Sequence, residues 1–269
     1  MVVTAQSSGA TSRGKQFFST LDGREMRFGY ATSWETLIPF GIEFSTLREL
    51  SSQTGLPIGE IGSAFSTLPY EAIALDTDWR TVDPLFSPDH SLAILVDTLL
   101  ASLGSTDTKF RSWYTQHGRQ AKRIVMARHI SRRLEDLSEQ QMFAATIVTN
   151  ALPKYSDRNR FIQTQLPALL RRTACVAYVY PLSVWSPLAS DSDNRLVCTD
   201  RLYNDPQYLA QLSETAATYG FGLELRTPDP LVVDRSPIMA LREFMPGLSI
   251  DFMHELDQPS LAIFRRLGS

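Results

Sequence analysis

The sequence predicts an α/β fold, with a mixed or mostly parallel sheet, helices on both faces and a large helical central section. The second half alternates segments typical of strands and helices, which favours a sheet with covering helices over an all-helical bundle. Its strongest strand is TACVAYVYPL at 173–182, which is apolar and β-branched or aromatic as expected of a strand buried on both faces. A helical pattern runs from Thr108 to about residue 150.

The elements expected in the first half follow from turn and capping signals. Residues 15–31 predict a hairpin around Asp22-Gly23, because Asp-Gly accepts the positive φ angles of a tight turn. Residues 45–68 predict two helices joined by a turn at Gly55. The run EAIALDTDW, residues 71–79, predicts a strand ending in a polar tip, and 90–104 a helix.

The second half is predicted from similar signals. Residues 157–172 favour a helix, with a kink or stop at Pro167. A short strand at 195–199 precedes a helix at 204–220, which Asp205 caps and Gly220 ends. Residues 221–226 predict a further strand.

Length and composition are those of an ordinary globular protein. The 269 residues predict a flexible tail over 1–16 and a single α/β domain over 17–269, with a helical subdomain over 105–172. Two cysteines make no disulfide framework, so we expect a reducing compartment and a cytoplasmic location. No apolar run reaches the roughly 20 residues that cross a bilayer, so no membrane span is expected.

Charge is segregated along the chain. Between Lys109 and Arg172 there are 13 Lys and Arg and four acids, so this segment carries +9. Because the net charge is −3, the remaining residues carry −12. A local excess of this kind acts on partners more than the average charge does.

The centre of the basic segment is RQAKRIVMARHISRRL, residues 119–134. On a helical wheel five side chains share an arc of about 140°, while Arg119 and Arg123 fall on the apolar side. The five are Lys122, Arg128, His129, Arg132 and Arg133. Since like charges on one face repel, they need an anionic partner.

Three kinds of partner fit this face. One is the acids of the same chain, or of another subunit in a homo-oligomer. The second is a phosphate-bearing small molecule or RNA, and Arg158 and Arg160 would extend its binding surface. The third is a membrane surface, because Trp113 and Tyr114 precede the run.

Asp76 and Asp78 are the candidate catalytic and metal-binding carboxylates, with His129 as a further catalytic candidate. If the strand stays extended through them, the two carboxylates point the same way and can share Mg²⁺ with a bound phosphate. The stretch LDTDWRTVD resembles the opening motif of haloacid-dehalogenase-like phosphatases, and equally the Asp-x-Asp of sugar transferases. Those resemblances imply a metal-dependent reaction on a phosphate-bearing substrate.

Two further resemblances imply other functions. Residues 46–67 resemble the helix-turn-helix of bacterial regulators, with Leu47, Leu50, Ile58, Ile61 and Phe65 at its buried positions, which implies DNA binding. The second helix would carry Glu60 and no Lys or Arg. The tail around His254 resembles that of α/β-hydrolases, but the sequence has no Gly-x-Ser-x-Gly, which implies a catalytically degenerate relative or a scaffold.

Taken together, these patterns favour a transferase that acts on a phosphate-bearing or RNA-linked substrate, such as an aminoacyl-tRNA, held by the basic face. The alternatives are the DNA-binding regulator and the degenerate hydrolase or scaffold. Neither a GxGxxG nor a Walker A loop is found, which argues against ordinary NAD enzymes and ATPases.

Overall fold

The computed structural model describes residues 18–21, 24–27, 41–42, 44–62, 68–84, 108–149, 157–187, 196–227, 258 and 260–268. The expected N-terminal tail, the helix at 90–104 and the segment around His254 lie outside these residues. No helix in the described ranges is long and apolar enough to cross a membrane.

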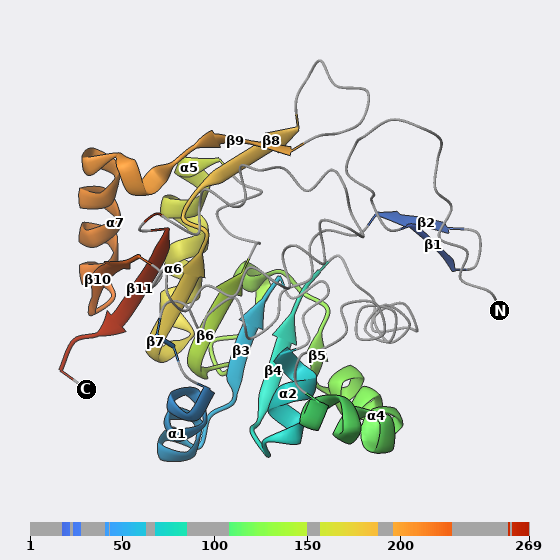
Figure 1. The fold of residues 1–269 in the computed structure, drawn as a ribbon. Coiled ribbons are helices and arrows are strands. Elements are labelled where there is room, and N and C mark those ends of the chain that lie inside the picture. Colours follow the sequence, from blue (N-terminus) through green and yellow to red (C-terminus); the bar gives the residue numbers. More distant parts are fainter. Residues whose placement is uncertain are drawn as a thin grey trace.

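A seven-stranded mixed sheet organises the described residues, in the order β10-β11-β7-β6-β3-β4-β5 (Figure 1). The strands are β3 (Ile58–Ile61), β4 (Trp79–Val82), β5 (His129–Ile130), β6 (Phe143–Thr149), β7 (Thr173–Tyr180), β10 (Phe221–Arg226) and β11 (Leu261–Arg266). The first five are parallel to one another, and β11 is antiparallel to both of its neighbours. The α/β fold predicted from the sequence is therefore confirmed.

Two small sheets lie outside this one. The hairpin predicted around Asp22-Gly23 is present as β1 (Phe18–Leu21) paired with β2 (Arg24–Arg27). The strand predicted at 195–199 is β9 (Leu196–Asp200), which pairs with β8 (Val184–Pro187) in a separate two-stranded sheet.

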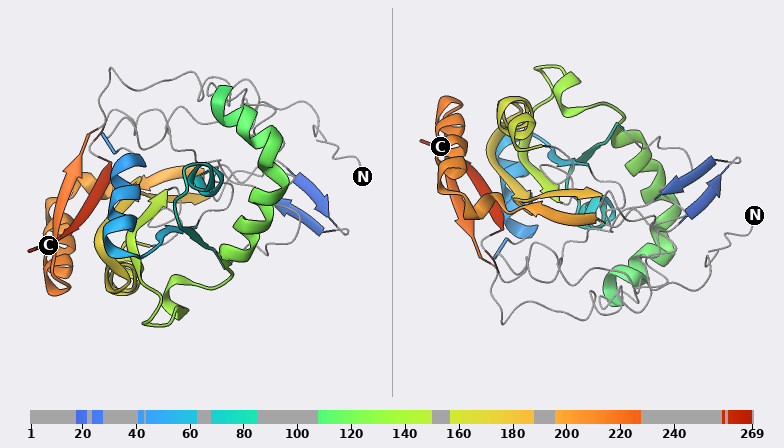
Figure 2. Two further views of the ribbon diagram at one scale, coloured as in Figure 1. Left: turned by 90° about the horizontal axis from the view of Figure 1, so that it is seen from below. Right: turned by 90° about the horizontal axis from the view of Figure 1, so that it is seen from above.

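Helices cover both faces of the large sheet. On one side lie α1 (Phe44–Thr54) and α2 (Leu68–Ala74), with α4 (Thr108–Arg128) packed on α2. On the other lie α5 (Arg158–Arg160), η4 (Phe161–Gln165), α6 (Leu166–Arg171) and α7 (Pro206–Thr218), with the short turns η3 (Leu134–Asp136) and η5 (Leu202–Asn204). Figure 2 shows α4 near the β4–β5 end of the sheet and α7 at the opposite end.

Strand β7 shows how its sequence specifies two cores. Val176, Tyr178 and Tyr180 are buried on the α1 side, while Ala177 and Val179 are buried on the α6–α7 side. Successive side chains of a strand point to opposite faces, so a continuous apolar run supplies both cores.

Three predicted elements are wrong, and the first is the helix-turn-helix. Residues 44–54 are helical, but 58–61 form β3, which pairs in parallel with β4 and β6 and is buried throughout. Ile58 and Ile61 match a helical spacing, but in this strand they pack into opposite cores. Gly59 leaves room for the ring of Phe143, which would lie 2.6 Å from an added Cβ. The predicted second helix is therefore wrong over 58–61.

The second error is the strand expected at 71–79. Residues 68–74 form α2, Asp76 turns the chain with a φ of 52°, and β4 begins at Trp79.

The third error is the single basic helix over 119–134. Helix α4 ends at Arg128, and β5 follows because His129 and Ile130 pair with Thr81 and Val82. The helical pattern expected to about residue 150 is likewise interrupted by β6.

Candidate functional site

The carboxyl ends of β3, β4 and β5 meet at one edge of the sheet. The backbone pairing continues one residue past the strands, because the Gly62 amide donates to the Val82 carbonyl at 2.8 Å and the Asp83 amide to the Ile130 carbonyl at 3.1 Å. Gly62 and the residues that follow β4 and β5 are therefore neighbours at this edge.

This edge also adjoins a switch point of the sheet. In chain order the five parallel strands are arranged 3-2-1-4-5, and the connections run in opposite directions from β3 and from β6. In open α/β sheets, ligands bind beyond the carboxyl ends of the strands at such a point. The topology therefore selects the end of β3 and its neighbours as the candidate site.

Gly62 turns the chain directly after β3, with a φ of 71°. A residue with a side chain rarely takes this conformation, and a glycine also lets a ligand approach the backbone closely. The next described helix along the chain is α2, Leu68–Ala74.

Asp83 is the buried carboxylate of the site, with 4% of its surface exposed. It follows the last residue of β4 and stands 21 residues after Gly62. In nucleotide-binding sheets of this type, an acid about 20 residues after the glycine turn accepts a hydrogen bond from a ribose hydroxyl. Asp83 has the residue type and the topological position for that contact.

Arg132 and Arg133 follow β5 after Ser131, at the same edge as Asp83. Both are exposed, and neither makes an ion pair with any described residue. The Arg132 amide donates to the Ile130 carbonyl at 2.9 Å, which turns the chain next to Asp83. These two predicted anion-binding residues can therefore act beside the buried carboxylate.

Below the edge, Glu60 forms part of the supporting core on the α1 side. Its side chain is fully buried, and its Oε2 accepts a hydrogen bond of 3.0 Å from the Trp79 indole N–H. The Phe44 ring stacks on Trp79 with centroids 5.9 Å apart. This contact fixes β3 against β4 two residues before Gly62.

His129 lies half-buried in β5, where its Nδ1 is 2.8 Å from the Thr81 hydroxyl. The contact joins the short edge strand to β4, and a catalytic role for His129 stays a prediction. Lys122 is half-buried on α4.

Asp76 and Asp78 lie before β4, at the edge opposite to Asp83. Asp78 forms ion pairs of 3.4 Å with both Arg80 and Arg128. The expectation that the two carboxylates end a strand is wrong, because α2 and its turn precede them. The described residues contain no group of three or more His, Cys, Asp or Glu able to hold a metal, and Mg²⁺ binding by this pair stays a prediction.

The exposed face of α4 also differs from the predicted one. Gly118, Ala121 and Val125 are buried, whereas Arg119 and Arg123, which the wheel put on the apolar side, are exposed. The wheel misjudged the phase because it treated residues 129–134 as helical. Lys122, Arg128, His129, Arg132 and Arg133 therefore do not share one helix face.

Arg158 and Arg160 bind acids of the same chain. Arg158 pairs with Asp205 and, at 3.5 Å, with Asp200, and its guanidinium lies 4.6 Å from the centre of the Tyr208 ring. Its hydrogen bond to Asp205 raises the pKa of Arg158, and the same bond lowers the pKa of Asp205. Arg160 lies 3.9 Å from Glu135. These contacts join α5 to β9, α7 and η3.

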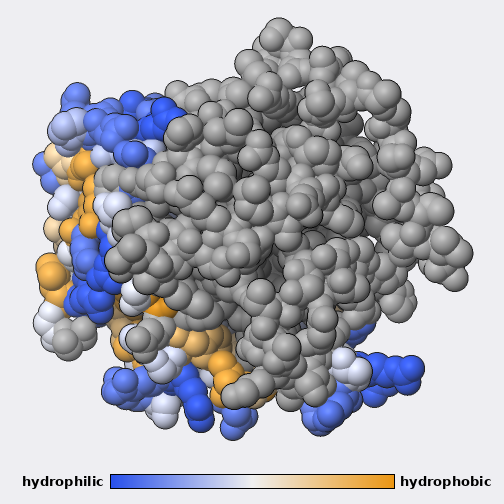
Figure 3. All heavy atoms as spheres, in the orientation of Figure 1, coloured by the Kyte–Doolittle hydropathy of each residue, from blue (hydrophilic) through white to orange (hydrophobic). Residues whose placement is uncertain are grey.

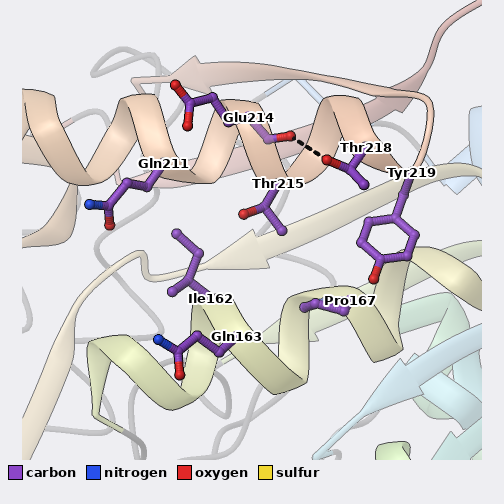
Figure 4. Close-up of a pocket in the computed structure, with 8 residues that line it drawn as sticks. All are labelled: Ile162, Gln163, Pro167, Gln211, Glu214, Thr215, Thr218 and Tyr219. Atoms are coloured by element: carbon purple, nitrogen blue, oxygen red, sulfur yellow. Dashed lines mark hydrogen bonds between the residues drawn. The ribbon is translucent and has the colours of Figure 1, made fainter.

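A shallow groove of about 400 Å³ lies between η4–α6 and α7 (Figure 4). Apolar atoms of Ile162 and Pro167 lie beside the polar groups of Gln163, Gln211 and Glu214. It contains none of the site residues predicted from the sequence, and it is separate from the edge that holds Gly62 and Asp83.

Sequence reasoning missed both Gly62 and Asp83 as site residues. The signal was present as a glycine after a short apolar run and an acid 21 residues later. The spacing points to a nucleotide site only if residues 58–61 form the first strand of the sheet, whereas their sequence pattern predicts a helix.

No protein family model and no curated protein sequence matches this chain. Among solved structures it is similar to a mutant form of the 16S rRNA (adenine(1408)-N(1))-methyltransferase from Catenulisporales acidiphilia with the cosubstrate SAM, at 11% identity, covering 83% of this chain and 89% of that one, with a TM-score of 0.35. It is also similar to the glycopeptide N-methyltransferase MtfA, at 10% identity, covering 82% and 88%, with a TM-score of 0.33. A structure of a putative methyltransferase from Thermoplasma acidophilum has 12% identity, coverage of 79% and 69%, and a TM-score of 0.31.

Proposed function

We propose that this chain is a transferase that binds a nucleoside-containing cosubstrate at Gly62 and Asp83 and a phosphate-bearing substrate beside it. The observation that carries the proposal is the buried Asp83 carboxylate, which follows the second parallel strand 21 residues after the glycine turn. A carboxylate in that position accepts hydrogen bonds from ribose hydroxyls.

The sequence after the first strand helps to decide whether the nucleoside carries a pyrophosphate. The chain reads Gly59-Glu60-Ile61-Gly62-Ser63-Ala64, without the full GxGxxG. A pyrophosphate is held by a glycine-rich turn that leads directly into a helix N-terminus. We therefore favour a nucleoside without a pyrophosphate over NAD or a nucleoside triphosphate.

S-adenosylmethionine is the first cosubstrate to test, because it has a ribose and no phosphate. When bound it supplies an electrophilic methyl group. The chain's own contribution would be threefold. Asp83 would fix the ribose, and Gly62 would let the cosubstrate approach the protein backbone closely. Arg132 and Arg133 would hold an anionic substrate. Arginine suits that last role because its planar guanidinium donates two parallel hydrogen bonds to a phosphate.

Isothermal titration calorimetry with S-adenosylmethionine tests the proposal on the full chain. We expect the wild type to bind and Asp83→Asn to bind about 10–100-fold more weakly, since a hydrogen bond to a charged group contributes about 1.5–3 kcal/mol. Asp76→Asn is the matched control, because Asp76 lies at the opposite edge, and we expect its affinity to equal that of the wild type.

Circular dichroism on each variant shows whether the fold is retained. The proposal is overturned if the folded wild type gives no binding heat with S-adenosylmethionine, or if Asp83→Asn and Asp76→Asn bind it as tightly as the wild type does.

A further inference from the structure

Exposed arginines lie on α4 as well as at the candidate site. Arg119 and Arg123 lie on the outer face of this helix, where Gln116 and Gln120 are also exposed. Four residues of helix span about 6 Å, so the two guanidinium groups emerge one turn apart on the same side. Figure 3 shows hydrophilic residues gathered over α4.

Two further exposed arginines lie at the carboxyl edge of the sheet, across β5 from the end of α4, where Arg128 pairs with Asp78. Helix α4 leads directly into β5, and Arg132 and Arg133 follow that strand. We call Arg119, Arg123, Arg132 and Arg133 the arginine strip. One end of the strip therefore lies beside Asp83 and the other on the outer face of α4.

Within the described ranges, the strip arginines have no acidic side chain as an ion-pair partner. From Thr108 to Leu134 the sequence has eight Lys and Arg and no acid. Among the described residues, Arg128 pairs with Asp78, whereas none of the four strip arginines takes part in an ion pair. Like charges four residues apart in a helix destabilise it, so an external polyanion would relieve the repulsion between Arg119 and Arg123.

The composition of the strip favours a phosphodiester backbone over an acidic protein. Its cations are all arginines, which bind phosphate in a bidentate geometry, and the glutamines between them can donate to phosphate oxygens. A protein partner would need a buried aromatic or aliphatic anchor. From Thr115 to Arg128 the exposed residues are Thr115, Gln116, His117, Arg119, Gln120, Arg123 and Ala127, with no large apolar side chain.

We infer that the substrate of the proposed transferase is a nucleic acid, whose backbone phosphates bind the arginine strip and lead one nucleotide to the edge at Asp83. This inference rests on the proposed function, because that edge is where the cosubstrate would bind. RNA and DNA share the phosphodiester chemistry that the strip recognises.

Fluorescence anisotropy with labelled 20-nucleotide single strands of RNA and DNA tests this inference at 50, 100 and 200 mM salt. Four phosphate contacts predict a slope of log K against log salt of about −2.8, which is about a 50-fold loss of affinity from 50 to 200 mM. Arg119→Gln with Arg123→Gln, and separately Arg132→Gln with Arg133→Gln, should each halve that slope to about −1.4. A preference for one of the two strands identifies the kind of nucleic acid.

The control is Arg48→Gln with Arg201→Gln, which removes two exposed arginines elsewhere and should leave the slope unchanged. The inference is overturned if neither strand binds at 50 mM salt, if the control loses as much affinity as the strip variants, or if polyglutamate of equal charge binds as tightly and loses affinity in the same variants.

The two proposals fail in different ways. Asp83→Asn should leave strand binding unchanged, and Arg119→Gln with Arg123→Gln should leave S-adenosylmethionine binding unchanged. If the protein binds S-adenosylmethionine but neither oligonucleotide, only the nucleic-acid inference is refuted. If it binds an oligonucleotide but not S-adenosylmethionine, the proposed transferase function is refuted and a nucleic-acid-binding surface remains.

Discussion

At the scale of single residues, charges are arranged in contacts that the sequence did not reveal. Arg128 and Arg158 were predicted to face a ligand, yet both bind acids that are distant in sequence. Which cation meets which acid depends on the packing of whole elements. The sequence could show that the 109–172 segment is basic, but not that Arg128 and Arg158 pair with acids of the same chain.

Asp205 predicts a pH dependence of stability. The hydrogen bond from Arg158, followed by that from the Tyr208 amide, lowers the pKa of this carboxyl in the folded state. Its stabilisation is therefore present above the ordinary aspartate pKa of about 3.9 and is lost as the pH falls through the lower folded value.

Asp205→Asn keeps an N-cap but loses the charge, so we expect it to melt below the wild type at pH 7, and the difference should shrink below about pH 4. Thermal melts followed by circular dichroism from pH 7 to 3 measure this. Glu214→Gln, on the same helix, is the control and should show no such trend. A difference in melting temperature between Asp205→Asn and the wild type that stays constant with pH would contradict the role given to the Asp205 charge.

A side chain at position 59 should clash with Phe143 and lower the stability of the fold. An added Cβ would lie 2.6 Å from the Phe143 ring, within a fully buried part of the sheet. We expect Gly59→Ala to lower the free energy of unfolding by about 1–3 kcal/mol, as overpacking does.

Urea unfolding measures the effect of Gly59→Ala. Gly222→Ala is the matched control, because its Cβ would meet only the end of the exposed Leu267 side chain, which can move. Equal losses in the two variants would rule out overpacking against Phe143 as the cause.

At the scale of elements, predictability follows the strength of local signals. β7 and α7 were predicted because eight consecutive strand formers specify the first, and an Asp-Pro start and a Gly end specify the second. β3, β4 and β5 have four, four and two residues, which is too short for a period to be visible. They form strands because neighbouring strands pair with them. The candidate site lies at their carboxyl ends, so it could not be predicted without them.

The N-cap of α5 gives an element-scale prediction. The Asp157 carboxylate accepts a hydrogen bond of 2.8 Å from the Arg160 amide. Asp157→Ala should lower the free energy of unfolding by about 0.5–2 kcal/mol, and Asp157→Ser should keep most of the stability, because serine also caps helices. Urea unfolding of the two variants checks this, and equal stability of Ala and wild type would show that the cap contributes nothing.

At the scale of the whole molecule, the sheet depends on its last strand. β11 pairs with β10 on one side and β7 on the other, and its residues Leu261 to Phe264 are fully buried. Arg266 also donates to the backbone carbonyls of Thr173 and Ala174, at 2.9 and 2.7 Å. Removing this strand would leave β10 without its pairing partner in the described sheet.

We expect a chain that ends at residue 259 to lose cooperative unfolding, as measured by circular dichroism in urea. A chain lacking only residues 268–269 is the control and should unfold like the wild type. A cooperative transition of unchanged midpoint in the shorter chain would show that β7 and its neighbours fold without β11.

The place of β11 also sets an order of events during synthesis. β10 ends at Arg226 and β11 begins at Leu261, so 34 residues must be added before β10 can be joined to the sheet. At about 5–20 residues per second, β10 waits about 2–7 s for β11, and β7, which ends at Tyr180, keeps an unpaired edge for about 4–16 s. Unpaired strand edges recruit other chains. We expect chaperones to bind the nascent protein during that interval. The exposure ends when β11 is made and pairs with β7 and β10.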